Sequence, residues 1–362
     1  MEEELTLLDP DSLDLAPRAP ELLRTLADPA RFHPELSPAQ IEIVSSVFRT
    51  AEEAAAAVAN GRAVVLHTTA GEVRLAGIGA HPFAEPWSAI SSGRRYASIA
   101  RRYRWGARRG GLAAGLHVHL GILGNDRLLA VYNAIRGYMP ELAALAASAP
   151  FLGGRDTGLA SIRPTLADAL PRQGVGPAFP TWGAYAALLA WGRSSGAFRD
   201  HTELWWECRL HPGFGTIEVR VPDAQAAIED VAATAALVHG LAHWLASRYD
   251  HGDPLPTHPT RSIAENRWRA AADGVEGELI DLDRSRMVQA RRHLARLIDT
   301  IGPCAPGQAD GRAIERAGRW LRRPRPTWQR AIASERGLRA LTAALADSTE
   351  SGACETPAAG TP

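Results

Sequence analysis

The sequence predicts an α+β fold in which helices pack on a mostly antiparallel sheet. Strand-like segments lie in the first two thirds of the chain and do not alternate regularly with helices, which disfavours a doubly wound sheet. From about residue 263 onward the pattern is helical and rich in arginine. We therefore expect a single domain over 1–347, with a helical C-terminal part, and a disordered tail of small and polar residues over 348–362.

The N-terminal half supplies most of the expected strands. The first 45 residues predict a strand, a turn and a second strand, because several prolines punctuate the connection. A helix is expected over 50–59, where Thr50 and Glu53 have the spacing of a capping box. The pattern over 63–78 predicts a hairpin around a Thr-Thr-Ala-Gly turn. The remaining strands are expected at 116–120, 204–209 and 216–221.

Helical periodicity predicts the other elements. We expect a basic helix over 97–109 and a long amphipathic helix over 127–148. The glycine- and proline-rich segment 150–180 has no period, and a loop of this length inside a compact domain is usually functional, so it is a candidate lid. Further helices are expected at 182–191, 224–248, 263–272, 284–301, 311–322 and 329–346.

Charge and composition exclude several classes of function. The formal net charge is zero, so bulk attraction to nucleic acid or to an anionic membrane is not expected. All 40 basic residues are arginine, which excludes a phosphate-binding loop that ends in Gly-Lys-Ser/Thr and a Schiff-base lysine. If the protein handles ATP, then arginine, metal ions and backbone amides must hold the phosphates.

The cysteines and the termini indicate a cytoplasmic protein. Cys208, Cys304 and Cys354 are odd in number and widely spaced, which disfavours a disulfide framework and a structural zinc site. No signal peptide is recognisable at the N-terminus, and no apolar run is long enough to span a membrane.

Four strand-like segments share an unusual pattern, in which aliphatic residues alternate with carboxylates, imidazoles or arginine. Successive side chains of a strand point to opposite faces, so alternate residues of each segment share one face and the aliphatic residues lie on the other. In the first segment, Glu3 falls on the aliphatic face with Leu5 and Leu7. Neighbouring carboxylates repel one another unless a cation lies between them. In chain order, the segments supply Glu2 and Glu4, then Glu42, then His117 and His119, and finally Glu218 and Arg220.

This charged face predicts a site for divalent cations. Carboxylate oxygens with an occasional imidazole suit Mg²⁺ or Mn²⁺, and the thiolates of a structural zinc site are missing. Such a face can hold two or more cations together with a nucleoside triphosphate. Zinc on His117, His119 and a glutamate is an alternative, which would indicate a metal-dependent hydrolase.

In their order along the chain, these segments resemble the carboxylate-amine ligases of the glutamate–cysteine ligase type 2 group, within the wider glutamine synthetase-like superfamily. The resemblance implies a glutamine synthetase-like catalytic fold, with a curved sheet, helices on its convex face and the active site on its concave face. It rests on the segments 2–10, 40–44, 115–122, 148–158, 215–225 and 265–271.

The resemblance also implies an ATP-dependent ligase, which joins a carboxylate to an amine through an acyl phosphate on Mg²⁺ or Mn²⁺. It implies small-molecule acid and amine substrates, and homo-oligomers occur among similar folds. His119 is expected near the nucleotide, and Glu218 and Arg220 are expected to be catalytic, with Arg220 on the transferring phosphate or on the acid. The expected metal ligands are Glu2, Glu4, Glu42, His117 and Glu218, and the expected substrate-facing residues are Arg155, Asp156, Thr157 and Arg163.

One feature of the sequence departs from this resemblance. Met1 directly precedes Glu2, whereas members of the group usually carry several further residues before the acidic triplet. A first strand without this lead-in would weaken the metal sites. The alternative expectation is therefore a catalytically impaired, metal-binding or regulatory homologue on the same fold.

Overall fold

The computed structural model describes residues 1–26 and 28–351, and its centre is a seven-stranded sheet in which every named strand pair is antiparallel. β4 (Arg74–Ala76) pairs with the C-terminal end of β1. The expected α+β class is confirmed. The order of the other strands is β2 (Phe32–Pro34), β3 (Gln40–Val44), β1 (Glu2–Leu8), β5 (Leu116–Gly121), β9 (Thr216–Val219) and β8 (Cys208–His211).

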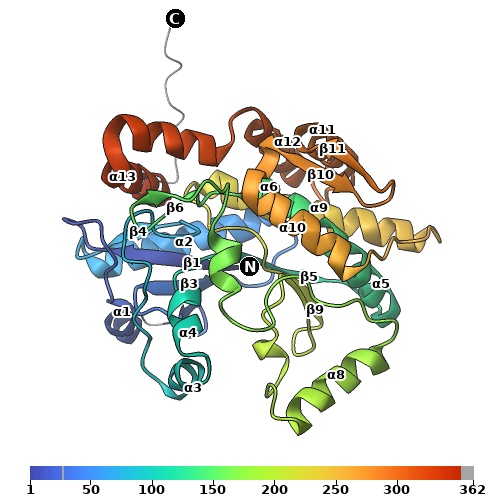
Figure 1. Cartoon of the computed structure of the whole chain (residues 1–362), viewed down its shortest axis with the longest axis horizontal. Coiled ribbons are helices and arrows are strands. Elements are labelled where there is room, and N and C mark those ends of the chain that lie inside the picture. Colours follow the sequence, from blue (N-terminus) through green and yellow to red (C-terminus); the bar gives the residue numbers. More distant parts are fainter. Residues whose placement is uncertain (27, 352–362) are drawn as a thin grey trace, which may run out of the picture.

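Two long helices, α2 (Ala51–Thr69) and α9 (Ile228–Asp250), pack against each other and against the sheet (Figure 1). They contact the aliphatic face of the strands, as the alternating pattern predicts. In the β1–β3 half, Leu5, Ile43 and the α2 residue Val65 belong to one fully buried cluster. Because one face of the sheet is covered in this way, the charged side chains are left on the opposite face.

The remaining elements surround this centre. Figure 1 shows α3 and α4 to one side of the sheet and α10 to α13 above it. In the described part of the chain, no helix is both long and apolar enough to cross a membrane. The helices are α1 (Ala19–Thr25), α3 (Arg94–Tyr103), α4 (Trp105–Gly110), α5 (Asn125–Ile135), α6 (Met139–Ala146), α7 (Arg163–Ala167), α8 (Trp182–Ser194), α10 (Thr260–Asp273), α11 (Ala290–Ile301), α12 (Gln308–Arg322) and α13 (Arg325–Ser351), and two small hairpins are β6 (Phe151–Leu152) with β7 (Arg155–Asp156) and β10 (Glu278–Asp281) with β11 (Arg286–Gln289).

The hairpin expected over 63–78 is wrong, because α2 continues through its first half to Thr69. The capping box at the start of this helix is confirmed, since Thr50 and Glu53 bond each other's backbone amides. Gly61 is tolerated inside the helix because a side chain there would collide with Ile43 of the sheet. Packing against the sheet thus outweighs the strand preference of the Val-Val pair that follows.

Other boundaries also differ from the expectation. The basic helix breaks into α3 and α4 at Arg104, whose φ is 48°. The helix expected over 127–148 breaks at a short turn over Arg136–Tyr138, and Pro140 lies in the first turn of α6, where proline is well tolerated. Residues 348–351 of the expected tail belong to α13, where Thr349 is buried and accepts a hydrogen bond from the backbone of Gly77. The rest of that tail, 352–362, lies outside the described residues.

A buried ion pair joins β1 to three other parts of the fold. The guanidinium of Arg62 on α2 donates to both carboxylate oxygens of Glu3, and both side chains are almost fully buried. The same guanidinium donates to the backbone carbonyls of Gln225, Ala226 and Thr349. Arg62 therefore ties the first strand to α2, to the segment before α9 and to α13.

We expect Glu3→Gln to lower the free energy of unfolding by about 3 kcal/mol, because it leaves a buried guanidinium without its carboxylate. Urea denaturation of wild type and variant measures this difference. Glu52→Gln, at an exposed glutamate on α2, is the matched control and should change stability by less than about 0.5 kcal/mol. A loss below about 1 kcal/mol in Glu3→Gln would show that the pair does not hold the strand.

Candidate active site

The register of the sheet brings the predicted metal-binding residues together. Glu4 lies directly opposite Glu42 on the neighbouring strand β3. On its other side, β1 places Glu2 opposite His117. The next pairing places His119 opposite Glu218. Directly opposite residues of adjacent strands share a face, so one acidic face crosses the sheet. We define the acidic face as Glu2, Glu4, Glu42, His117, His119 and Glu218.

Glu2 lies between the two histidines. Its carboxylate oxygens are 3.2 Å from His117 Nδ1 and 3.0 Å from His119 Nε2. The other nitrogen of His119, Nδ1, is 3.1 Å from the hydroxyl of Thr216. Burial alone would raise the pKa of Glu2, but the hydrogen bonds to His117 and His119 outweigh burial and lower it. These contacts therefore favour the ionised form of Glu2.

Two overlapping sets of donor atoms can hold a cation. In each set, atoms from three side chains lie within 4.8 Å of one another. Both sets use His117, whose buried Nε2 has no hydrogen-bond partner and lies 3.7 Å from the nearest Glu4 oxygen. A metal ion would satisfy this nitrogen, so the residues present fit a divalent cation. The sets are Glu2, His117 and Glu218, and Glu4, Glu42 and His117.

Burial makes several carboxylates of this face hard to ionise. It raises the pKa of Glu42 well above its ordinary value, and the charges of Glu35 and Glu2 raise that pKa further. Burial also raises the pKa of Glu4 and that of Glu35. By contrast, burial lowers the pKa of His117, as does the charge of Arg220. In the metal-free protein the face thus carries less negative charge than its composition suggests.

Glu218 is held by two arginines. Arg209 donates through Nε and Nη2 to its two oxygens at 2.7 and 2.9 Å, and Arg220 donates to one of them. Burial opposes the charge of Glu218, but Arg220 and Arg209 outweigh burial and lower its pKa. Arg209 was not among the predicted residues, although it alternates with Cys208 and Leu210 on β8, and the same period-two pattern could have found it.

A cleft of about 120 Å³ opens beside this face. Arg163, a predicted residue, lines it and donates to the backbone carbonyls of Arg220 and Val221 at 3.0 Å. Glu35 also lines the cleft and was missed, because it lies in a short connection without period between β2 and β3. The cleft thus has acidic and basic groups on its walls. Its other charged and aromatic lining residues are Glu4, Arg95, Tyr96, Trp205, Glu207 and Arg220.

The other predicted substrate-side residues are not brought to the acidic face. Asp156 forms a two-pronged ion pair with Arg330 of α13 at 2.8 and 2.9 Å. The hydroxyl of Thr157 donates to the carbonyl of Pro150, and Arg155 is exposed on β7. These contacts fix the β6–β7 turn against α13. A substrate role for the three residues stays a prediction without support from their positions.

Aromatic rings gather at the far end of the face, next to His119. The rings of His211 and Phe214 are stacked with centroids 4.1 Å apart, and both meet His119 edge to face. His201 adds an edge contact to His211 at 4.5 Å. Phe214 is 68% exposed, so this cluster presents an open apolar surface beside a charged one.

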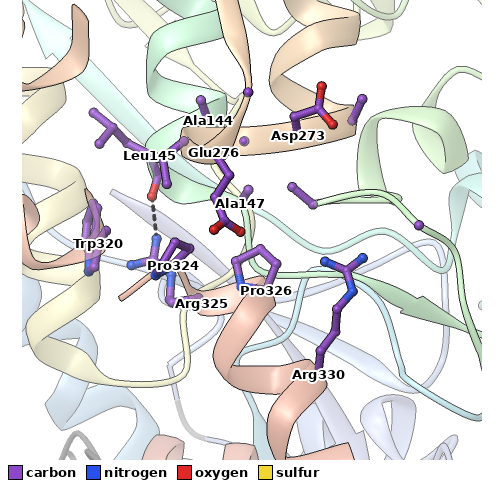
Figure 2. A pocket seen from close by; sticks show the side chains of 16 residues that line it. Ala144, Leu145, Ala147, Asp273, Glu276, Trp320, Pro324, Arg325, Pro326 and Arg330 are labelled. Atoms are coloured by element: carbon purple, nitrogen blue, oxygen red, sulfur yellow. Dashed lines mark hydrogen bonds between the residues drawn. The ribbon is translucent and has the colours of Figure 1, made fainter. Parts of the chain in front are cut away.

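A second cavity, of about 180 Å³, lies where α6, α10, α12 and α13 meet (Figure 2). Three of its charged side chains already have partners. Arg330 is engaged by Asp156, and Glu276 accepts hydrogen bonds from Arg291 and Thr327. Arg325 donates to the carbonyl of Leu145, as Figure 2 shows. The acidic face therefore remains the better candidate for chemistry.

The chain shares its fold with solved ligases. It superimposes on glutamate–cysteine ligase from Francisella tularensis, solved in complex with AMP, with a TM-score of 0.72 over 97% of this chain and 88% of that one. A bifunctional glutathione synthetase from Pasteurella multocida gives a TM-score of 0.71 over 97% of this chain and 52% of that one. Sequence identity is 14% in both cases, so these likenesses concern the fold.

Comparison of sequences identifies the family of the chain. A provisionally named glutamate–cysteine ligase 2 of Thermobifida fusca is 33% identical over 84% of this chain and 78% of its own length. Another, of Arthrobacter, is 32% identical over 97% of this chain and 96% of its own length. The family model for glutamate–cysteine ligase family 2 matches residues 1–323. The chain therefore belongs to the glutamate–cysteine ligase family 2.

Proposed function

We propose that this ligase uses ATP to activate a carboxylic acid as an acyl phosphate, which an amine then attacks to form an amide. The acidic face is the observation that supports this proposal most strongly. This face contains facing carboxylates with raised pKa values and an imidazole nitrogen without a hydrogen-bond partner. Such buried groups lower the stability of a fold unless they bind cations. Mg²⁺ or Mn²⁺ suits these donors and commonly accompanies ATP.

The acidic face and Arg220 would have different roles in phosphoryl transfer. When bound, the divalent cations neutralise phosphate oxygens of ATP. Glu2, Glu4, Glu42, His117 and Glu218 would hold them. Arg220 lies between this face and the cleft, with its guanidinium on Glu218 and 3.4 Å from His117 Nδ1. It is therefore placed to stabilise the charge that develops on the transferring phosphoryl group.

The acid substrate would occupy the cleft of about 120 Å³ and the nucleotide base the opposite end of the face. Arg95 lines the cleft, where its guanidinium can hold a carboxylate in two-pronged fashion. Arg163 lines the same cleft, but both of its terminal nitrogens already donate to backbone carbonyls. The stacked rings of His211 and Phe214 beside His119 offer a flat surface for adenine. The structural relative from Francisella tularensis, with its bound AMP, is consistent with a nucleotide on this fold.

A zinc-dependent hydrolase is disfavoured. Family membership identifies the chain as a ligase, and His119 is already engaged by Glu2 and Thr216. An impaired homologue stays the alternative for activity. However, Met1 does not leave the first strand loose, because its amino group donates to Ser45 and its carbonyl accepts from the same residue.

Phosphate release from ATP tests the proposal directly. With Mg²⁺ and a panel of amino acids, singly and in pairs, we expect release that requires an acid and increases when an amine is added, because the amine consumes the acyl phosphate. Malachite green detection with product mass spectrometry measures both steps. Absence of release with every pair would leave the impaired homologue as the better account.

We expect Glu42→Gln to separate function from folding. The change removes one of several repelling carboxylates, so the Tm in EDTA should stay the same or rise, while metal affinity falls by at least about tenfold. Differential scanning fluorimetry with and without Mn²⁺ measures both effects. The matched control is Glu335→Gln on the exposed side of α13. A lower Tm in EDTA would assign Glu42 a structural role instead.

Cation binding should weaken as the pH falls. The raised pKa values of Glu4, Glu35 and Glu42 keep these groups protonated at a pH where ordinary glutamates are ionised. A cation binds the ionised form, so each displaced proton lowers the apparent affinity about tenfold per pH unit below the raised pKa. For the same reason, these three groups should lower the stability of the metal-free protein as the pH rises from the ordinary pKa of glutamate through their raised values. Glu2 and Glu218, whose pKa values are lowered, contribute the opposite dependence at lower pH. Calorimetric titration with Mn²⁺ across the pH range checks the sign, and an affinity independent of pH would contradict it.

A further inference from the structure

The helices α3 and α4 and the loop before them form the most unbalanced charge distribution in the sequence. Residues 86–125 contain seven arginines and no aspartate or glutamate, although the whole chain has zero net charge. Six of these arginines are exposed. We define the arginine patch as Arg94, Arg95, Arg101, Arg102, Arg104, Arg108 and Arg109, with the exposed rings of Trp87 and Trp105.

Little within the fold neutralises this patch. Among the described residues, Arg102 is the one member with a carboxylate within ion-pair distance, and Glu203 lies 3.6 Å from it. Arg108 and Arg109 donate only to backbone carbonyls and lie over the rings of Trp87 and Trp105. By contrast, arginines elsewhere, such as Arg62, Arg209 and Arg267, are paired with acids. The patch thus exposes positive charge that carboxylates of the described residues largely leave unneutralised.

The patch continues directly into the cleft beside the acidic face. Arg95, Tyr96 and Ile99 of α3 form one wall of that cleft, together with Gly110 of α4. Arg163 and Arg220 line the same cleft. An anionic chain that places one carboxylate near Arg220 can therefore leave the cleft across α3.

Size favours a chain over a single small acid. A free amino acid that fills a cleft of about 120 Å³ does not reach the outer arginines of α3 and α4. Arg94 and Arg101 are seven residues apart, so they lie on one side of a helix about 15 Å long. An extended peptide covers this length with about four or five residues.

We infer that the acid substrate is one carboxylate of an acidic peptide chain, such as an oligoglutamate, whose other carboxylates lie along the arginine patch. This inference rests on the proposed function and specifies the acid that the cleft accepts. A nucleic acid fits the surface less well, because each exposed tryptophan already has an arginine over its ring and so offers less room for a stacked base. The active site beneath the patch is also proposed to activate a carboxylate, a group that nucleic acids lack.

The test is fluorescence anisotropy of the full-length protein with labelled hexa-L-glutamate. Labelled hexa-L-glutamine and a six-nucleotide single-stranded RNA serve as comparison ligands. The triple variant Arg101→Gln, Arg104→Gln and Arg108→Gln removes charge from the patch and leaves the cleft residues Arg95, Arg163 and Arg220 intact. The matched control changes three exposed arginines of β11, α11 and α12, by Arg286→Gln, Arg296→Gln and Arg312→Gln.

We expect hexaglutamate to bind in preference to hexaglutamine and RNA, and its affinity to fall with added salt. The patch variant should weaken hexaglutamate binding at least about fivefold, and the control variant should not. Equal binding by the patch variant and wild type, an equal loss in the control, or tighter binding of the RNA would overturn the inference.

Phosphate release from ATP separates this inference from the proposed function. The KM for hexaglutamate should lie below that for free glutamate, and the patch variant should remove this advantage. If free glutamate supports release and hexaglutamate is no better, the inference fails while the proposed function stands. If no acid supports release, the proposed function fails, and the anisotropy measurement alone decides whether the patch binds acidic chains.

Discussion

Repulsion among carboxylates on one face of a sheet is the constraint around which this protein is organised. Glu2, Glu4 and Glu42 lie on adjacent strands, and Glu35 adds a fourth negative group beside them. Like charges this close cannot all ionise in a region with little water. The metal-free fold meets this constraint in two ways. Burial raises the pKa of some carboxyls and so favours their protonated form, and arginines and histidines stabilise the ionised form of others. Added cations would complete the neutralisation, so the metal site follows from the same physics that shapes the sheet.

β1 connects the stability of the fold to the chemistry of the site. Its two faces carry glutamates with different roles. Glu3 points to the helical side and pairs with Arg62, while Glu2 and Glu4 point to the acidic face. A slip of one residue in strand register would exchange these roles, because the side chains of a strand alternate with a period of two. The hydrogen bonds of Arg62 to three distant carbonyls disfavour such a slip. A structural ion pair on one side of the strand thus positions the functional carboxylates on the other.

Much of the acidic face could be predicted from the sequence, because alternation within a strand assigns a face to each residue without knowledge of the fold. Which strands are neighbours could not be derived that way. The resemblance to a known family implied a shared set of ligands, and the structure gives the strand order. Arg209 follows the same alternation and could have been predicted from it, whereas Glu35 lies in an aperiodic connection and could not. The segment 63–67 was expected to be the first strand of a hairpin, and packing of Gly61 against Ile43 explains why it is helical. The β10–β11 hairpin was missed because β11 falls inside the helix expected over 284–301, while β10 lies in the stretch between two expected helices.

We propose that the acidic face binds divalent cations through carboxylates and the imidazole of His117. Pulsed electron paramagnetic resonance of bound Mn²⁺ tests it most directly, because coupling to a ligand nitrogen identifies a coordinated imidazole. We expect nitrogen coupling in the wild type that is lost in His117→Asn and retained in His293→Asn, since His293 pairs with Glu141 away from the sheet. Bound Mn²⁺ without nitrogen coupling, or coupling that persists in His117→Asn, would contradict it.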